Sequence, residues 1–516
     1  MPHFGVSIDP NRKIKLCLFL FVISILVFIS GARLVSSDEV SMYLTIESLV
    51  KSGTFAIPLE NAPNSSNVDG KSYTWYEAGN ILAGIPFYCA GNIAASILPL
   101  SESLKSFIPR AAVSLTGAFF GGWIAVLFFS VLRKLGVSLR VSIGMALALT
   151  LSTFLLPYFK MFMREPILAL CLLGACGYLL PGPKNRNNDR ALIVAGIFTG
   201  YGILTKLAFA INLLPLLVYI YRNDNKDLSG RLREVLLFLI PVFILGLGGT
   251  MMYNFLRFGN PMNIGYAGGT SFTTPVFVGL YGLLLSPGKG ILWFAPMLFL
   301  LIPSHGVFRK KFPRETYLIA VLFLANLLLS SVYVAWGGDG SWGPRYLAPL
   351  LPLIFLPVSL YLDQATRTIK RIALTLALFG FIIQLGGISI YAGAYLREIG
   401  EYPYQRDIGD PEFLYKAHFI PNYSPVIGHW RMLSRNAIEH LEGNYPQFSV
   451  IGQAADNRLP IADDEKSKLL HTIDFWFTYA LYANISKKII FTVAFLLLGL
   501  CGISGFLLNR VTLKNH

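Results

Sequence analysis

Long apolar runs alternate with short polar segments along the whole chain. A helix that crosses the ~30 Å hydrocarbon core of a bilayer needs about 20 apolar residues, and runs near this length recur throughout. They lie at 16–34, 80–100, 107–132, 141–158, 165–182, 191–221, 234–253, 289–304, 315–334, 346–362, 372–393 and 487–508. This pattern predicts an all-α polytopic membrane protein.

Basic clusters between the runs predict the topology. Lys and Arg gather at 12–15, 133–140, 184–190, 222–233, 309–314, 367–371 and 510–514. Because positively charged short loops stay in the cytoplasm, an even number of crossings must separate neighbouring clusters, which gives about twelve spans with both termini inside. The polar stretch 394–486 then lies outside, between the last two spans, and the short run 276–285 lies at the outer interface.

Parity also constrains the first part of the chain. Only two of its three apolar runs can cross, and 80–100 contains Gly84, Pro86 and Gly91. We therefore expect this run to lie along the outer interface or dip into it. Residues 35–106 would then form an outer loop that carries interfacial helices.

The apolar run 191–221 has Lys206 at its centre. A single span would break the parity and place a lone ammonium at mid-membrane, which costs several kcal/mol. Two short helices, 191–204 and 207–221, avoid both problems. Each would rise only ~22 Å, so the tip that carries Lys206 would lie below the outer surface, inside protein.

Composition and charge agree with this topology. Of the 516 residues, 54% are hydrophobic and 14% are charged, whereas soluble proteins carry roughly 25% charged residues. The net charge of +15 sits in the short loops, so it marks topology rather than a nucleic-acid partner. The five cysteines lie in apolar runs without C-x-x-C spacing, which argues against a disulfide framework or a thiolate metal site.

The remaining membrane-proximal polar residues all fall on the outer side. They are Asp38, Glu39, Tyr76, Arg164, Glu165, Lys206, Asn254, Arg257, Lys289, Trp336, Asp339, Trp342 and Arg345. Charges near the membrane are costly, so a convergent set indicates a functional cavity. Its cations, Arg164, Lys206, Lys289 and Arg345, suit a phosphate or a pyrophosphate. Its aromatic residues suit the face of a sugar, or an interfacial belt.

The acidic residues suit general-base chemistry, with Asp38 as the leading candidate beside Glu39 and Glu165. Structural alternatives stand beside each assignment. Ser36-x-x-Glu39 is a capping box, and Arg164 and Glu165 could pair with each other. We expect no cofactor, although the three carboxylates could share a divalent metal.

These residues resemble motifs of the GT-C membrane glycosyltransferases, in particular the aminoarabinose transferase and protein O-mannosyltransferase branch. The Asp38-Glu39 pair before an amphipathic helix resembles the catalytic loop of that family, and Arg164-Glu165-Pro166 resembles its second outer acidic site. The segment Gly202–Lys206 matches a G-x-x-T-K hairpin. The family often has Lys-Pro-Pro where this chain has Tyr76-Glu77-Ala78-Gly79, so phosphate binding falls to other cations.

The resemblance implies a function and a domain organisation. An inverting enzyme of a bacterial inner or plasma membrane would move a sugar from a polyprenyl-phosphate carrier to a protein, lipid or glycan acceptor on the extracytoplasmic side, with Asp38 as base. Residues 1–393 would be the catalytic module, 394–486 an extracytoplasmic segment, and 487–516 the last span and tail. The alternatives are a transporter or flippase of a lipid-linked or anionic substrate, and a ligase or polymerase that uses pyrophosphate-linked glycans.

Overall fold

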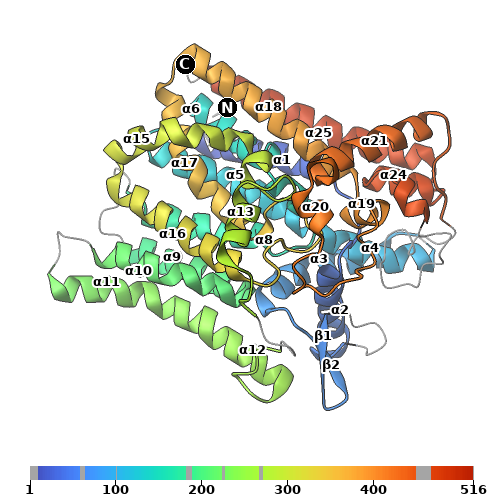
Figure 1. Ribbon diagram of the computed structural model, residues 1–516, viewed down its shortest axis with the longest axis horizontal. Helices are drawn as coiled ribbons and strands as arrows, with labels where there is room; N and C mark the ends of the chain where they lie inside the picture. Colours follow the sequence, from blue (N-terminus) through green and yellow to red (C-terminus); the bar gives the residue numbers. More distant parts are fainter. Residues whose placement is uncertain are drawn as a thin grey trace, which may run out of the picture.

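Helices form nearly all of the regular structure (Figure 1). The computed structural model describes residues 10–57, 64–99, 101–181, 189–222, 227–265, 271–448 and 467–514. Parts of the basic clusters 184–190 and 222–233, and residues 449–466 of the outer segment, lie outside the described residues. The predicted all-α polytopic fold is confirmed. Seven helices of the described part are long and apolar enough to cross a membrane, and shorter apolar helices accompany them.

The transmembrane body is built from α1 (Pro10–Phe28), α5 (Thr116–Lys134), α6 (Leu139–Leu151), α8 (Glu165–Leu179), α9 (Asp189–Thr205), α10 (Leu213–Tyr221), α11 (Leu228–Pro241), α12 (Gly249–Phe258), α15 (Leu301–Lys311), α16 (Pro313–Val332), α17 (Leu351–Gln364), α18 (Arg367–Ser389) and α25 (Lys487–Lys514). A π-helical stretch, η3 (Val242–Gly248), joins α11 to α12. Every predicted apolar run has a helical counterpart, with ends shifted by a few residues.

The remaining elements connect or flank these helices, and two of them, α3 and α4, belong to segments that are themselves apolar enough to cross a membrane. They are α2 (Ser37–Ser52), β1 (Ser65–Val68), β2 (Lys71–Thr74), α3 (Ala78–Ile97), α4 (Glu102–Ser114), α7 (Leu155–Phe159), η2 (Leu207–Asn212), α13 (Val276–Leu284), α14 (Ile291–Phe294), η4 (Pro296–Leu300), η5 (Arg345–Leu350), α19 (Ala392–Glu398), α20 (Tyr415–Phe419), η6 (Pro421–Tyr423), α21 (Pro425–Leu441), η7 (Leu469–His471) and α24 (Trp476–Tyr482).

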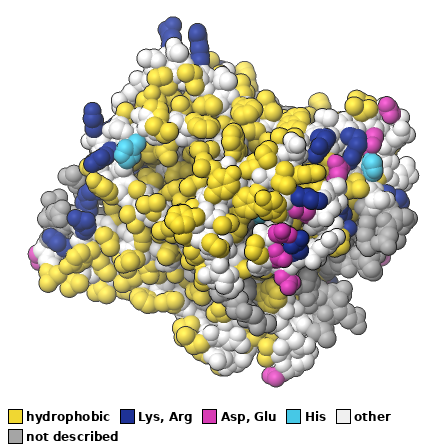
Figure 2. All heavy atoms as spheres, viewed as in Figure 1, with side chains coloured by type: hydrophobic (Ala, Val, Ile, Leu, Met, Phe, Trp, Pro, Cys, Tyr) yellow, Lys and Arg dark blue, Asp and Glu magenta, His cyan; other side chains and the backbone are white. Residues whose placement is uncertain are grey.

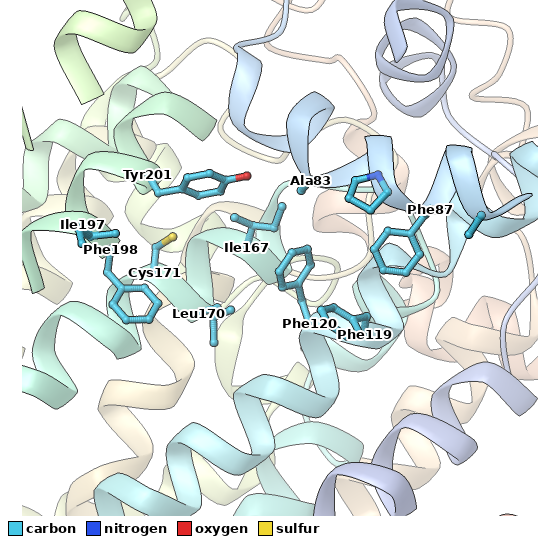
Figure 3. A pocket seen from close by; sticks show the side chains of 12 residues that line it. Ala83, Phe87, Phe119, Phe120, Ile167, Leu170, Cys171, Ile197, Phe198 and Tyr201 are labelled. Atoms are coloured by element: carbon cyan, nitrogen blue, oxygen red, sulfur yellow. The ribbon is translucent and has the colours of Figure 1, made fainter. Parts of the chain in front are cut away.

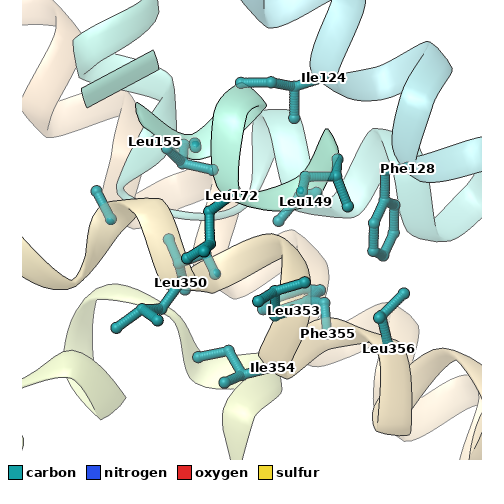
Figure 4. Close-up of a cluster of buried hydrophobic side chains, with 14 of the residues drawn as sticks. Ile124, Phe128, Leu149, Leu155, Leu172, Leu350, Leu353, Ile354, Phe355 and Leu356 are labelled. Carbon is teal, nitrogen blue, oxygen red and sulfur yellow. The ribbon is translucent and has the colours of Figure 1, made fainter. Parts of the chain in front are cut away.

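Side chains from distant parts of the chain fill the core. Phe128 of α5, Leu149 of α6, Leu172 of α8 and Leu353 of α17 are buried together (Figure 4). These helices are hydrophobic on most of their surface, as expected for helices buried inside a membrane protein. The packing fixes the first residues of α8 and η5, where three charged residues of the site lie: Arg164, Glu165 and Arg345.

The two chain ends lie on the same side of the bundle. Helix α25 packs along α1, with Gly505 against Phe21 and Cys501 hydrogen-bonded to Ser24. Since residue numbers rise in opposite directions along the contact, the two helices are antiparallel. The structure therefore has both termini on one side of the bundle, as charge parity predicts.

The outer loop contains an element that the sequence did not predict. Strands β1 and β2 form an antiparallel hairpin in which Ser65 faces Thr74 and Val68 faces Lys71. Each strand has only four residues, too few for a clear alternating pattern. The run expected at 107–132 also begins earlier, because α4 starts at Glu102 and packs against α3 before the chain continues into α5.

Surface charge follows the topology. A broad apolar surface covers the view in Figure 2, with Lys and Arg along its upper and left margins. On the right, beside the elements of the outer segment (Figure 1), Asp and Glu gather together with further Lys and Arg. Such a surface, bounded by charge at its edges, is suited to lipid.

Candidate active site

The helical hairpin around Lys206 forms as predicted. Helix α9 ends at Thr205, Lys206 is extended with φ −158° and ψ 117°, and η2 begins at Leu207. Helix α3 lies against this tip: a Cβ on Gly79 would be 2.2 Å from the Thr205 Oγ1, and the Tyr201 hydroxyl donates to the Gly79 carbonyl at 2.8 Å. Helix α3 is also one of the seven helices that are long and apolar enough to cross a membrane, so its predicted interfacial position stays a prediction.

Glu39 joins two outer loops. The predicted capping box at the start of α2 is present, with Ser36 as the N-cap. One oxygen of the fully buried Glu39 carboxylate accepts from the backbone N–H groups of Val35 and Ser36, both at 2.9 Å, and the other accepts from Phe162 N at 2.7 Å. The residue thus fixes the chain before Asp38 to the turn before Glu165.

Arg345 bridges two of the predicted acidic residues. Its Nη2 lies 3.0 Å from Asp38 Oδ2, and its Nε lies 2.6 Å from Glu165 Oε1. Glu165 is fully buried, and its second oxygen has no hydrogen-bond partner among the described residues. Three residues separated by more than a hundred positions therefore meet, because α2, α8 and η5 all begin at this point.

Asp38 lies at the edge of this cluster, with 19% of its side chain exposed. Besides Arg345 it accepts hydrogen bonds from Asn64 Nδ2 at 3.1 Å and from the Tyr76 hydroxyl. Burial favours the neutral acid, but the charge of Arg345 and the bond from Tyr76 outweigh it and lower the pKa of Asp38 below its ordinary value. Asp38 is consequently ionised at neutral pH.

Arg164 pairs with a residue that the sequence analysis did not select. Its Nη1 lies 2.7 Å from Glu77 Oε2, while Glu77 Oε1 accepts from Leu207 N at 3.0 Å. In the structure Arg164 thus pairs with Glu77, and Glu165 pairs with Arg345. Glu77 lies in the Tyr76-Glu77-Ala78-Gly79 segment, whose departure from the family's Lys-Pro-Pro was the available signal for it.

The environment of Lys206 differs from that of the two arginines. Its ammonium lies 4.3 Å from the centre of the Tyr346 ring, and no hydrogen bond or ion pair holds it within the described residues. It faces a cavity of about 330 Å³ together with Arg164, Glu165 and Arg345. The rest of the lining is mostly apolar and includes Phe209, Asn212, Thr250, Asn254, Phe272, Leu329, Tyr333 and Tyr346. An uncommitted cation in a sunken cavity with apolar walls suits an anionic head group that carries a hydrocarbon chain.

Two other predicted cations, Lys289 and Arg257, support the walls of the cavity and do not line it. The Lys289 ammonium donates to the carbonyls of Asp339 at 3.0 Å and Ser341 at 2.5 Å. Arg257 donates to the carbonyl of Thr74 at 2.6 Å and to Asn254 Oδ1 at 2.7 Å, which ties β2 to α12.

The two tryptophans of loop 336–345 are packed inside the protein. Trp336 is buried beside His418, with ring centres 5.1 Å apart. Trp342 donates through Nε1 to Gln384 Oε1 at 2.9 Å. The structure thus does not bring either ring to the cavity, because each stabilises the loop that ends at Arg345.

A second buried ion cluster lies beneath the site. Asp474 of the outer segment accepts from Arg33 Nε at 3.0 Å and Nη2 at 2.9 Å, and its second oxygen lies 3.0 Å from Lys160 Nζ. Arg33 precedes the Asp38 loop and Lys160 precedes the Arg164–Glu165 turn. Because Arg33 and Lys160 are isolated charges in polar loops, the sequence gave no signal for this contact.

The acidic residues are poorly arranged for a metal. Among the described residues no three His, Cys, Asp or Glu side chains gather as ligands would. Arg345 stands between Asp38 and Glu165, and Glu39 points to backbone N–H groups. A donor set already paired with a guanidinium does not fit a divalent cation.

A larger hollow of about 600 Å³ lies on the other face of α8 (Figure 3). Phe87 of α3 and Phe119 and Phe120 of α5 face Phe198 and Tyr201 of α9 across it. Its lining is almost entirely apolar, so it offers space for hydrocarbon but no reactive groups.

The fold that carries this site is the fold of the GT-C membrane glycosyltransferases. The crystal structure of ArnT from Cupriavidus metallidurans bound to undecaprenyl phosphate aligns with a TM-score of 0.50 and 14% identity, covering 97% of this chain and 77% of ArnT. The archaeal oligosaccharyltransferase AglB from Archaeoglobus fulgidus, in complex with an inhibitory peptide and a dolichol-phosphate, aligns with a TM-score of 0.43 and 10% identity over 93% of this chain and 72% of AglB.

No family model and no curated protein sequence matches the chain. At such low identity the structural similarity establishes the fold alone. The predicted GT-C architecture of an integral membrane protein is confirmed, and the chemistry must be argued from the residues of this chain.

Proposed function

We propose that the protein is a glycosyltransferase that takes a sugar from a polyprenyl-phosphate carrier on the extracytoplasmic side of the membrane. The observation that supports this proposal most directly is that Arg345 and Glu165 line the same sunken cavity as the uncommitted Lys206, while Arg345 also holds Asp38 beside it. The carrier phosphate binds Lys206 and, beside it, Arg164. The apolar lining contributed by Phe209, Phe272 and Leu329 suits the first isoprene units.

Asp38 acts as the base. It takes the proton of an acceptor hydroxyl as the acceptor oxygen bonds to the anomeric carbon, and the bond from that carbon to the phosphate oxygen breaks on the opposite face. The departing phosphate keeps the electron pair, and Lys206 and Arg164 stabilise its charge where it develops. Backside displacement inverts the anomeric centre. Glu39, Lys289 and Arg257 position the loops, and Arg345 orients Asp38.

Two observations favour this function over its alternatives. A transporter needs charged groups that serve both leaflets, usually in inverted repeats, whereas the converging charges of this cavity lie at one end of α8, α9 and η5. One uncommitted lysine with one arginine suits a single phosphate better than a pyrophosphate.

The test is an in vitro assay with purified chain in lipid nanodiscs and radiolabelled polyprenyl-phosphate hexoses and pentoses. We expect Asp38→Asn to lower kcat by about a hundredfold or more, with a small change in KM for the donor. Lys206→Ala should lower kcat and raise the donor KM.

Matched controls come from the same outer loop. Asp69→Asn and Lys71→Ala change exposed residues of the β-hairpin and should behave as the parent chain. Full turnover by Asp38→Asn would show that Asp38 is not the base. Product formation by the parent chain that does not depend on the donor would rule out the proposed reaction.

A further inference from the structure

A polar hollow of about 300 Å³ separates the loop 336–345 from the outer segment. Asp339 forms one wall, and residues 404–408 with Phe413 form the other. It shares no lining residue with the cavity that contains Lys206. The hollow therefore offers a second, separate approach to the same loop.

Asp339 is held in this wall at a conformational cost. Its φ is +54°, a left-handed conformation that non-glycine residues rarely adopt, and the Lys289 ammonium fixes its carbonyl at 3.0 Å. Its Oδ1 is buried without a hydrogen-bond partner among the described residues. A buried carboxylate oxygen without a donor, on a strained backbone fixed by a buried lysine, is typical of a functional position.

The hollow is close to the proposed chemistry. The charges of Arg345 and Asp38 both act on the Asp339 carboxyl, which burial holds at a raised pKa. Arg345 itself lines the donor cavity. A group seated against Asp339 would thus lie near Asp38 without occupying the cavity that contains Lys206, which leaves that cavity to the donor.

The chemistry of the walls selects a class of acceptor. Arg406 already pairs with Asp410 at 3.4 Å and with Glu412, so the carboxyl groups of Asp339 and Asp407 are the acidic groups that the hollow offers to a ligand. Carboxylates accept hydrogen bonds from hydroxyl groups and repel anions. Tyr404 and Phe413, with ring centres 5.1 Å apart, add aromatic surface for an apolar sugar face.

We propose that this hollow is the acceptor subsite, and that the acceptor presents a neutral, hydroxyl-rich saccharide unit to Asp339 and Tyr404. The assignment rests on the proposed function and specifies its second substrate. Water can replace the acceptor in such a reaction, so the ratio of transfer to donor hydrolysis reports on acceptor binding alone. Loss of folded protein lowers both rates together and leaves the ratio unchanged.

The experiment measures this ratio in nanodiscs, with a polyprenyl-phosphate hexose and tagged neutral oligosaccharides of glucose, mannose, galactose or N-acetylglucosamine. A Ser/Thr-rich peptide serves as the competing acceptor class. We expect the parent chain to glycosylate a saccharide, and Asp339→Asn and Tyr404→Ala to lower the ratio by about tenfold. Tyr415→Ala, an exposed aromatic residue outside the hollow, is the matched control and should keep the ratio.

Three results would overturn the assignment. The ratio could stay within twofold of the parent value in both Asp339→Asn and Tyr404→Ala. The peptide alone could accept sugar, or no saccharide of the set could. A parent chain that hydrolyses no donor would instead remove the proposed function itself, so the two failures are distinguishable.

Discussion

Three cations of the site carry the same charge but have different partners. Arg345 is committed to Asp38 and Glu165, and Arg164 to Glu77, whereas the Lys206 ammonium rests over the Tyr346 ring. A guanidinium with its planar fork suits fixed bridges between carboxylates, and an ammonium is a point charge that can be shared with a ligand. The arginine that bridges the carboxylates is thus suited to positioning them, and the lysine is suited to binding the proposed phosphate.

The state of Asp38 can be tested through pH. A lowered pKa means that Asp38 is ionised at neutral pH and that its contribution to the rate is lost only as pH falls through that pKa. Tyr76→Phe removes one bond that lowers the pKa, so the pKa rises and the acid limb of kcat/KM moves upward by about one pH unit. The measurement is a pH–rate profile of donor turnover.

Tyr73→Phe provides the comparison, because Tyr73 is a buried tyrosine of β2 that packs on Phe258. Its profile should superimpose on that of the parent chain. An acid limb that stays in place in Tyr76→Phe would show that the titrating base is not Asp38.

At the scale of elements, the site is the meeting point of four chain segments that are fixed to one another by buried polar contacts. Glu39 links the start of α2 to the turn before α8, and Glu77 links the start of α3 to η2. Asp474 ties the outer segment to both acidic loops through Arg33 and Lys160. The outer segment is therefore joined by buried ion pairs to the loops that carry Asp38 and Glu165.

Asp474→Asn should uncouple these elements. Removing one partner of a buried ion cluster leaves uncompensated charge and typically costs about 3–5 kcal/mol. We expect a clear fall in the thermal unfolding temperature in detergent together with lost donor turnover. Asp410→Asn removes a half-exposed partner of Arg406 and should change neither. Equal thermal unfolding temperatures of Asp474→Asn and Asp410→Asn would contradict a structural role for the Asp474 contact.

The contact between α3 and the Lys206 hairpin gives another prediction. A Cβ on Gly79 would lie 2.7 Å from the Thr205 backbone, so Gly79→Ala must displace the hairpin tip and should destabilise the protein by about 1–3 kcal/mol. Gly144→Ala is the matched change, because Gly144 lies in α6 with open space around it, and alanine should be neutral or stabilising there. Thermal unfolding and the donor KM of the two variants are the measurements.

At the scale of the whole molecule, charged side chains lie around the margins of a broad apolar surface (Figure 2). Antiparallel packing of α1 and α25 returns the chain to its starting side, and the acidic loops gather at the other end. A one-ended arrangement of this kind suits an enzyme that works at one face of a membrane.

Single-cysteine labelling tests the orientation. In a chain whose native cysteines are replaced, a membrane-impermeant thiol reagent should label Lys71→Cys and Asp407→Cys in intact cells. It should label Arg233→Cys and Lys370→Cys only after permeabilisation, because basic loops stay in the cytoplasm. All four positions are exposed. The reverse pattern would invert the topology and place the cavity on the cytoplasmic side.

The sequence by itself determined the helical membrane fold and the break at Lys206, and it identified the charged residues that meet on one side. Hydrophobic run length, basic loops and the cost of a buried ammonium are local properties, and each can be evaluated without knowing the neighbours. The capping box at Ser36 and Glu39 is local in the same sense, and it formed as predicted.

Only the tertiary structure decided what each charge does. Asp38 and Arg345 are 307 positions apart and Arg33 and Asp474 are 441 apart, so no local pattern could pair them. Trp336, Trp342 and Lys289 look in the sequence like ligands of a site, but packing turns them into the walls of the loop that presents Arg345. The partner of a buried charge depends on which helix ends meet, and this follows from how all the helices pack together.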